Sequence, residues 1–157
     1  MAYIAYTYLY GSGLITQENL ANLVDKTNDP GQLDAPALAI IAEAIAAVDS
    51  VVDSHISVVY SGALPLTSPP NSVKRCVAIG TLYQLWQGQQ VPHESNPYAD
   101  AWEDQIMWLK AIANGSANLD LTDDGGGIIG PQPPKYNTDR QYTDRQFSPD
   151  STDILEF

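Results

Sequence analysis

Apolar side chains recur at spacings of three and four residues through the middle of the chain. The clearest run consists of Leu38, Ile41, Ile45, Val48, Val52 and Ile56. This spacing places all of them on one face of a helix. Asp34 can act as an N-cap, and Ala35-Pro36 supplies a first-turn proline. The pattern therefore predicts a helix of about 20 residues, or ~30 Å, beginning after Asp34.

Start and stop signals predict three further helices around this one. The first begins after Thr16 and ends before Asp29-Pro30-Gly31, a strong turn sequence. Another opens at Ser68-Pro69-Pro70. The last is capped by Asn96-Pro97 and ends with Gly115 as its C′ residue. Four helices with short connections predict an all-α fold, a small four-helix bundle.

Residues 1–13 show a different pattern. Ile4, Tyr6, Tyr8 and Tyr10 alternate with other residues, and this period of two favours a strand or an extended arm. A lone strand has no partner inside a helical bundle, so a neighbouring subunit is one source of a partner. An unpaired arm is the alternative.

Composition changes at about Leu121. Residues 122–157 contain a Gly-rich stretch, several prolines and little apolar periodicity, so they predict an extended tail. The chain thus divides into an N-terminal extended arm (1–13), a helical domain (14–121) and an acidic C-terminal tail (122–157).

The tail contains a tandem repeat. Thr138-Asp-Arg-Gln-Tyr142 is followed at once by Thr143-Asp-Arg-Gln-Phe147, and the chain closes with Ile154-Leu155-Glu156-Phe157. Aromatic side chains at regular intervals along an extended segment are suited to pockets on another protein. The alternative is a tail that folds back on its own bundle.

The charge balance limits the possible partners. The chain has 19 acidic and 7 basic residues, a net charge of −12 and a pI near 4.1. This argues against a protein that grips nucleic-acid phosphates with a broad basic face. No stretch approaches the ~18–20 consecutive apolar residues of a membrane span, and no basic residue precedes Lys26 as a targeting signal would require. We therefore expect a soluble cytoplasmic protein without a membrane partner.

Candidate catalytic groups do not form a recognisable constellation. Asp53 and His55 are two residues apart and point in different directions on a helix. His93-Glu94 has no second ligand nearby in sequence, and the lone Cys76 is most simply a small buried apolar residue. The acids at the start of the last helix are explained by its dipole: Asp100, Glu103 and Asp104. We expect no enzyme activity, no cofactor and no metal.

Several segments of the chain have a characteristic order and spacing. The central ones are Ala47 through Ile56, then Tyr60, Leu64-Pro65-Leu66 and Pro69, then Val73 through Ile79 with Tyr83 and Leu85. The outer ones are Ile15 through Leu20 and Asp144 through Phe157. Together they resemble the Mu-type phage head–tail connector family over most of residues 14–119 and the last dozen or so. Val59 stands where the family usually has arginine.

The resemblance implies a structural virion protein with a connector-type bundle. Members form a ring, expected to be dodecameric, below the portal; it extends the DNA channel and provides the docking surface for the tail. The implied partners are the portal protein, a tail-terminator or other neck protein, further copies of the chain, and DNA that passes without specific binding. The implied location is the virion neck, after synthesis in the host cytoplasm. An acidic lumen would repel the DNA phosphates and let the duplex slide.

Three groups of residues are the expected contacts of such a ring. The tail would reach the portal or a neighbour through Tyr136, Tyr142, Phe147, Leu155 and Phe157. The loop after the long helix would contact the next subunit through Tyr60, Leu64, Pro65 and Leu66. The acids that would line the channel are Asp100, Glu103 and Asp104.

A second hypothesis belongs to another class of protein. A monomeric acidic helical protein with a net charge of −12 could mimic nucleic acid and inhibit a DNA-binding enzyme. Against it, charged residues make up only 17% of the chain, and the acids are scattered through helices and tail.

Overall fold

The computed structural model describes residues 2–24, 33–90, 92–119, 121–122 and 128–130. Its helices are α1 (Tyr6–Gly11), α2 (Gln17–Val24), α3 (Ala35–Tyr60), α4 (Asn71–Gly88) and α5 (Ala99–Ala113). Short 3₁₀ turns, η1 (Ser61–Ala63) and η2 (His93–Ser95), follow α3 and α4, and β1 (Leu121–Thr122) pairs antiparallel with β2 (Ile128–Ile129). The predicted all-α fold, with four main packed helices, is confirmed.

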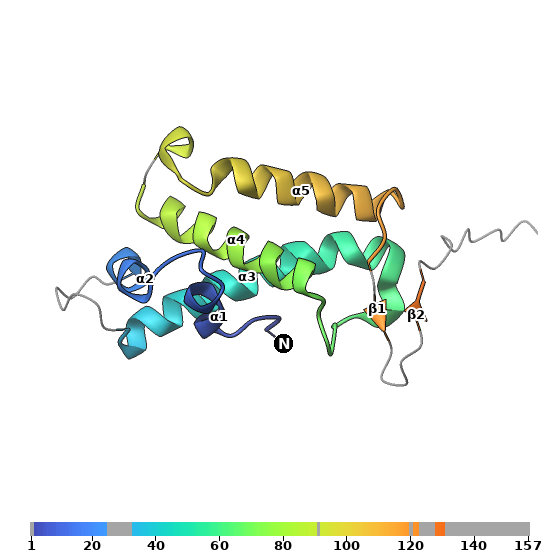
Figure 1. The fold of residues 1–157 in the computed structure, drawn as a ribbon, viewed down its shortest axis with the longest axis horizontal. Coiled ribbons are helices and arrows are strands. Elements are labelled where there is room, and N and C mark those ends of the chain that lie inside the picture. The colour runs from blue at the N-terminus through green and yellow to red at the C-terminus, as the bar shows by residue number, and fades with distance from the viewer. Residues whose placement is uncertain (1, 25–32, 91, 120, 123–127, 131–157) are drawn as a thin grey trace, which may run out of the picture.

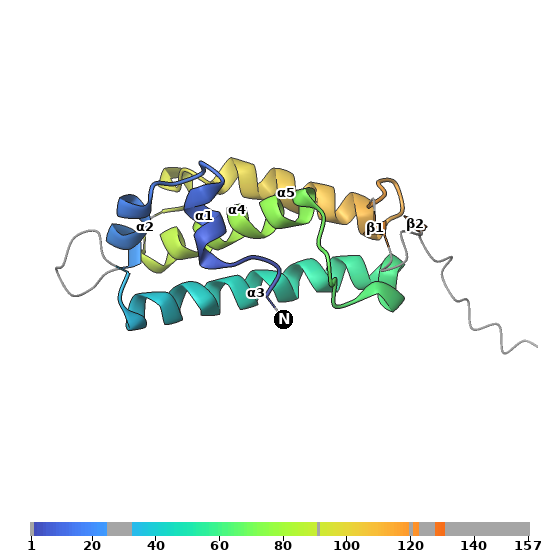
Figure 2. The same ribbon diagram turned by 60° about the horizontal axis from the view of Figure 1, so that its bottom comes forward.

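The three long helices α3, α4 and α5 pack on one another and form the body of the molecule (Figures 1 and 2). Helices α1 and α2 lie against α3 and α4, and α2 covers the end at which α3 begins. All five helices contribute to one core. Its largest fully buried side chains are Leu9, Leu20, Ile41, Val48, Val52, Ile56, Tyr60, Val73, Val77, Leu82, Leu109 and Ile112.

Local sequence signals set three of the helix ends. The Asp34 carboxylate accepts a hydrogen bond from the Ala37 N–H at 2.8 Å, and the Thr16 hydroxyl accepts one from the Asn19 N–H at 3.2 Å. Gly115 adopts φ +73° directly after the α5 C-cap, a conformation that glycine adopts without strain. Helix α3 has 26 residues, more than expected, and is ~39 Å long at 1.5 Å per residue.

Two local predictions were wrong. Asn96 does not cap α5, which begins at Ala99; its side chain instead accepts from the Tyr98 N–H and donates to the Tyr83 carbonyl. Within the predicted extended arm, Tyr6–Gly11 form helix α1. The alternation of tyrosines suggested a strand, but the side chain that this segment buries in the core is Leu9. Tyr6 is 40% exposed.

Helix α3 is unusually apolar for its length. By length and hydropathy, the helical stretch Ala35–Ala63 could cross a membrane, although the sequence contains no uninterrupted apolar run of that length. Serines, aspartates and His55 interrupt the run. In the fold, one face of α3 packs against α1, α2, α4 and α5, as the central helix of a bundle does.

Candidate functional site

A pair of carboxylates on α3 holds the N-terminal segment. The Tyr3 backbone N–H donates to Asp49 Oδ2 at 3.1 Å, and the Tyr3 hydroxyl donates to Asp53 Oδ1. The same hydroxyl accepts from the Leu66 N–H at 3.4 Å. Tyr3 thereby joins the start of the chain, the middle of α3 and the loop that follows η1.

Asp49 is the most buried of these charged groups, with 6% of its surface exposed. Burial raises its pKa above the ordinary value, the negative charge of Asp53 raises it further, and the hydrogen bond from the Tyr3 N–H partly opposes this. Burial and the bond to Asp53 likewise raise the pKa of Tyr3. Sequence reasoning missed this cluster. The available signal was that Asp49 follows Ile45 by four residues and so falls on the apolar face.

A second polar network lies on the surface where η2 meets α4 and α5. Tyr83 Oη lies 3.1 Å from His93 Nδ1, and His93 Nε2 lies 3.1 Å from Glu103 Oε1. Gln87 donates to the Tyr83 hydroxyl at 2.7 Å, and the Tyr83 ring stacks on Trp102. The network fastens the α4–α5 connection, so the side chain of His93 has a structural role.

The acids proposed to line a channel lie together on α5. All three are exposed, and Asp100 and Asp104, one turn apart, share a face of the helix. Glu103 is paired with His93 instead of standing free.

The loop expected to contact another subunit is divided between core and surface. Tyr60 is 1% exposed and its hydroxyl accepts from the Leu119 N–H at 3.1 Å, and Leu66 is also buried. Both side chains therefore pack within their own bundle. Leu64 is half-buried and Pro65 is exposed, so these two are the members that a neighbour could reach. The tail residues Tyr136, Tyr142, Phe147, Leu155 and Phe157 lie outside the described residues.

The remaining reactive side chains are separated from one another. Cys76 is fully buried, and burial raises the pKa of its thiol to about 12. His55 Nδ1 lies 2.9 Å from the Val51 carbonyl of its own helix. Within the described ranges, no group of three or more His, Cys, Asp or Glu side chains could hold a metal ion.

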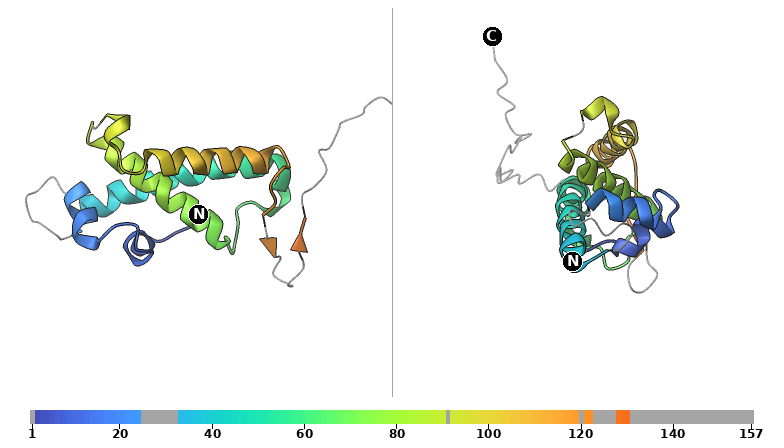
Figure 3. Two further views of the ribbon diagram at one scale, coloured as in Figure 1. Left: turned by 45° about the horizontal axis from the view of Figure 1, so that its top comes forward. Right: turned by 90° about the vertical axis from the view of Figure 1, so that its left-hand side faces the viewer.

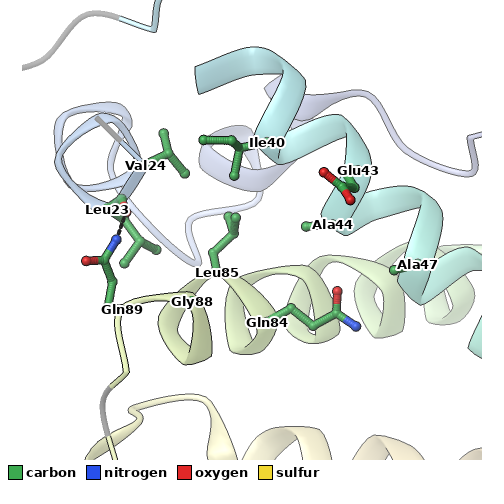
Figure 4. A pocket seen from close by; sticks show the side chains of 10 residues that line it. All are labelled: Leu23, Val24, Ile40, Glu43, Ala44, Ala47, Gln84, Leu85, Gly88 and Gln89. Carbon is green, nitrogen blue, oxygen red and sulfur yellow. Dashed lines mark hydrogen bonds between the residues drawn. The ribbon is translucent and has the colours of Figure 1, made fainter. Parts of the chain in front are cut away.

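An apolar groove is bounded by α2, α3 and α4 (Figure 4). It has a volume of about 430 Å³ and is lined by Leu23, Val24, Ile40, Glu43, Ala44, Ala47, Gln84, Leu85, Gly88 and Gln89. Ile40 and Leu85 point into the same space from opposite helices, and Gln89 donates to the Leu23 carbonyl at one end. The α2 end of the bundle is thus hollowed, which the sequence could not reveal because the groove combines three helices.

These features define an all-α bundle whose polar side chains tie its elements together and whose surface carries an apolar groove between α2, α3 and α4. A family model described as Bacteriophage Mu, Gp36, matches residues 12–128. The chain belongs to this family of phage proteins. No curated protein matches the chain.

Proposed function

We propose that the chain is a structural virion protein, a head–tail connector that forms a ring, expected to be dodecameric, below the portal. The observation that carries the proposal is the match to a phage Mu family over residues 12–128. The order and spacing of the sequence segments that resemble the connector family also support it. The ring would extend the DNA channel and offer the surface on which the tail docks.

The shape of the bundle suits this role. Helices α3, α4 and α5 form an elongated body, so copies can stand side by side around an axis (Figure 2). Asp100 and Asp104 are exposed on one face of α5 and are suited to a lumen that repels DNA phosphates. Leu64 and Pro65 would contact the next subunit. The tail would reach the portal through Leu155 and Phe157, the last anchors of the chain.

The copy number in virions tests this proposal. Quantitative mass spectrometry of purified, DNA-filled virions would compare this chain with the portal protein. A ratio near one to one is expected of a neck ring. Absence from virions, with abundant protein in infected cells, would contradict the proposal and favour an acidic inhibitor of a DNA-binding enzyme.

A further inference from the structure

The groove between α2, α3 and α4 has a wall that suits an aromatic side chain. Leu23, Val24, Ile40 and Leu85 provide apolar surface, and Ala44, Ala47 and Gly88 leave room because their side chains are small or absent. Nothing lies within 4 Å of the position of a Cβ added at Gly88. A volume of about 430 Å³ falls in the range of sites that enclose ligands, roughly 300–1,000 Å³.

The charge at the groove is negative. Glu43 is exposed and its carboxylate lies beside the apolar wall, whereas the described lining residues include no lysine or arginine. A fitting occupant therefore combines an aromatic ring with a nearby cation.

The tandem repeat in the tail has this chemistry twice. In an extended segment, residues two apart point to the same side. If the repeat binds as an extended segment, Arg140 and Tyr142 would face one side, and Arg145 and Phe147 would likewise share a side. Two of the three arginines in this acidic chain occur in the repeat. When either ring enters the groove, the arginine two residues before it can face Glu43.

The route of the chain favours the groove of another copy. The Leu119 N–H bonds to Tyr60, so the chain leaves the bundle beside the C-terminal end of α3. Helix α2, which bounds the groove, lies at the opposite end of α3 (Figures 1 and 3). Ile40 and Tyr60 are ~30 Å apart along the helix, and the 12 residues from Gly130 to Tyr142 span at most ~40 Å. Tyr142 could reach its own groove only if most of this stretch were extended, whereas Phe147, 17 residues after Gly130, could span up to ~60 Å and is not restricted in this way.

We propose that the tail repeat Thr138–Phe147 of one copy docks in the α2–α3–α4 groove of a second copy, with Tyr142 inserted and Arg140 paired with Glu43. The contact joins different surfaces of two identical chains, and such a head-to-tail contact closes into a ring when its rotation allows. The inference rests on the proposed function and deepens it by naming the partner of the tail anchors.

Photo-crosslinking of the full chain tests the docking directly. A p-benzoylphenylalanine is placed at position 142, and equal amounts of ¹⁵N-labelled and unlabelled protein are mixed at high concentration and irradiated. The expected products are heavy–light crosslinks between the repeat and peptides that contain Ile40, Ala44 or Leu85. Crosslinks only within heavy or within light chains would overturn the proposal in favour of a tail that docks on its own bundle. Crosslinks elsewhere, or none, would also overturn it.

Charge reversal tests the ion pair. Glu43→Lys should lower the yield of heavy–light crosslinks about three- to tenfold because attraction becomes repulsion. Combining it with Arg140→Glu and Arg145→Glu should restore the yield. Glu94→Lys makes the same charge change at an exposed position of η2, away from the groove lining, and should leave the yield unchanged. Equal losses for Glu43→Lys and Glu94→Lys, or no rescue, would contradict the pairing.

The two proposals fail in different ways. A chain present in virions at the portal's copy number, but without crosslinks in the groove, would retain the connector and remove this docking. Heavy–light crosslinks from a chain absent from virions would retain the docking and remove the connector.

Discussion

Gly80 and Gly88 lie on the same helix, α4, in opposite packing environments. A Cβ at Gly80 would come within 2.5 Å of Trp102 Cζ3 and 2.8 Å of Val48 Cγ1, whereas a Cβ at Gly88 would meet nothing within 4 Å. The missing side chain at Gly80 lets α3, α4 and α5 close tightly, and the one at Gly88 helps to leave a groove open. Glycine thus allows close helix packing in the middle of the bundle and leaves space for the groove at its end.

The pair of glycines provides the largest expected effect. Gly80→Ala forces its methyl group into the Trp102 ring and Val48, and overpacking of this kind costs about 1–3 kcal/mol of unfolding free energy. Gly88→Ala, the matched control, should be neutral or stabilising by up to about 1 kcal/mol. Urea denaturation followed by circular dichroism measures both. Equal unfolding free energies of the two variants would contradict the difference in packing between Gly80 and Gly88.

A single buried hydroxyl stabilises the C-terminal end of α3. Tyr60→Phe removes the acceptor of the Leu119 N–H in a buried position. An unpaired buried donor costs about 1 kcal/mol or somewhat more. Tyr6→Phe, at a 40% exposed ring, is the control and should change stability by less than about 0.5 kcal/mol. A Tyr60→Phe protein as stable as the control would contradict the role of this hydrogen bond.

The smallest effect concerns pH and Asp49. Because the fold raises the pKa of Asp49 above its ordinary value of 3.8, the folded state binds the proton more tightly than the unfolded chain. Its contribution to stability is therefore lost as pH rises from about 3.8 through the raised pKa. Asp49→Asn stays neutral and still accepts from Tyr3, so it should remove this slope and remain within about 1 kcal/mol of the wild type at pH 7.

Urea denaturation over a pH series measures the slope. Asp100→Asn, at an exposed position, is the control. Its unfolding free energy should depend on pH as that of the wild type does, apart from a small effect of the lost surface charge. Parallel curves for wild type and Asp49→Asn would contradict the buried titration.

Local signals in the sequence predicted the parts of the fold that depend on near neighbours. The cap at Asp34, the left-handed Gly115 and the stripe of α3 all follow from residues a few positions apart. Helix α1 could not be predicted in this way, because only the folded core shows that this segment buries Leu9 and leaves Tyr6 exposed. The helix start at Ala99 was missed because Asn96 bonds to the Tyr83 carbonyl, 13 residues away.

The candidate sites were less predictable for the same reason. The lone polar residue on the stripe, Asp49, gave a hint, but its partner Tyr3 is 46 residues away. The groove joins Leu23, Ile40 and Leu85 from separate helices. The roles of the tail anchors stay predictions from sequence, as do those of the channel acids and the subunit-contact loop.

The docking of Tyr3 has a consequence for how the protein is made. Its hydroxyl contacts the Leu66 N–H, 63 residues later in the chain. At a synthesis rate of about 5–20 residues per second, Tyr3 leaves the ribosome several seconds before this partner exists. The hydrogen bond between Tyr3 and Leu66 can therefore form only after all of α3 has been synthesised.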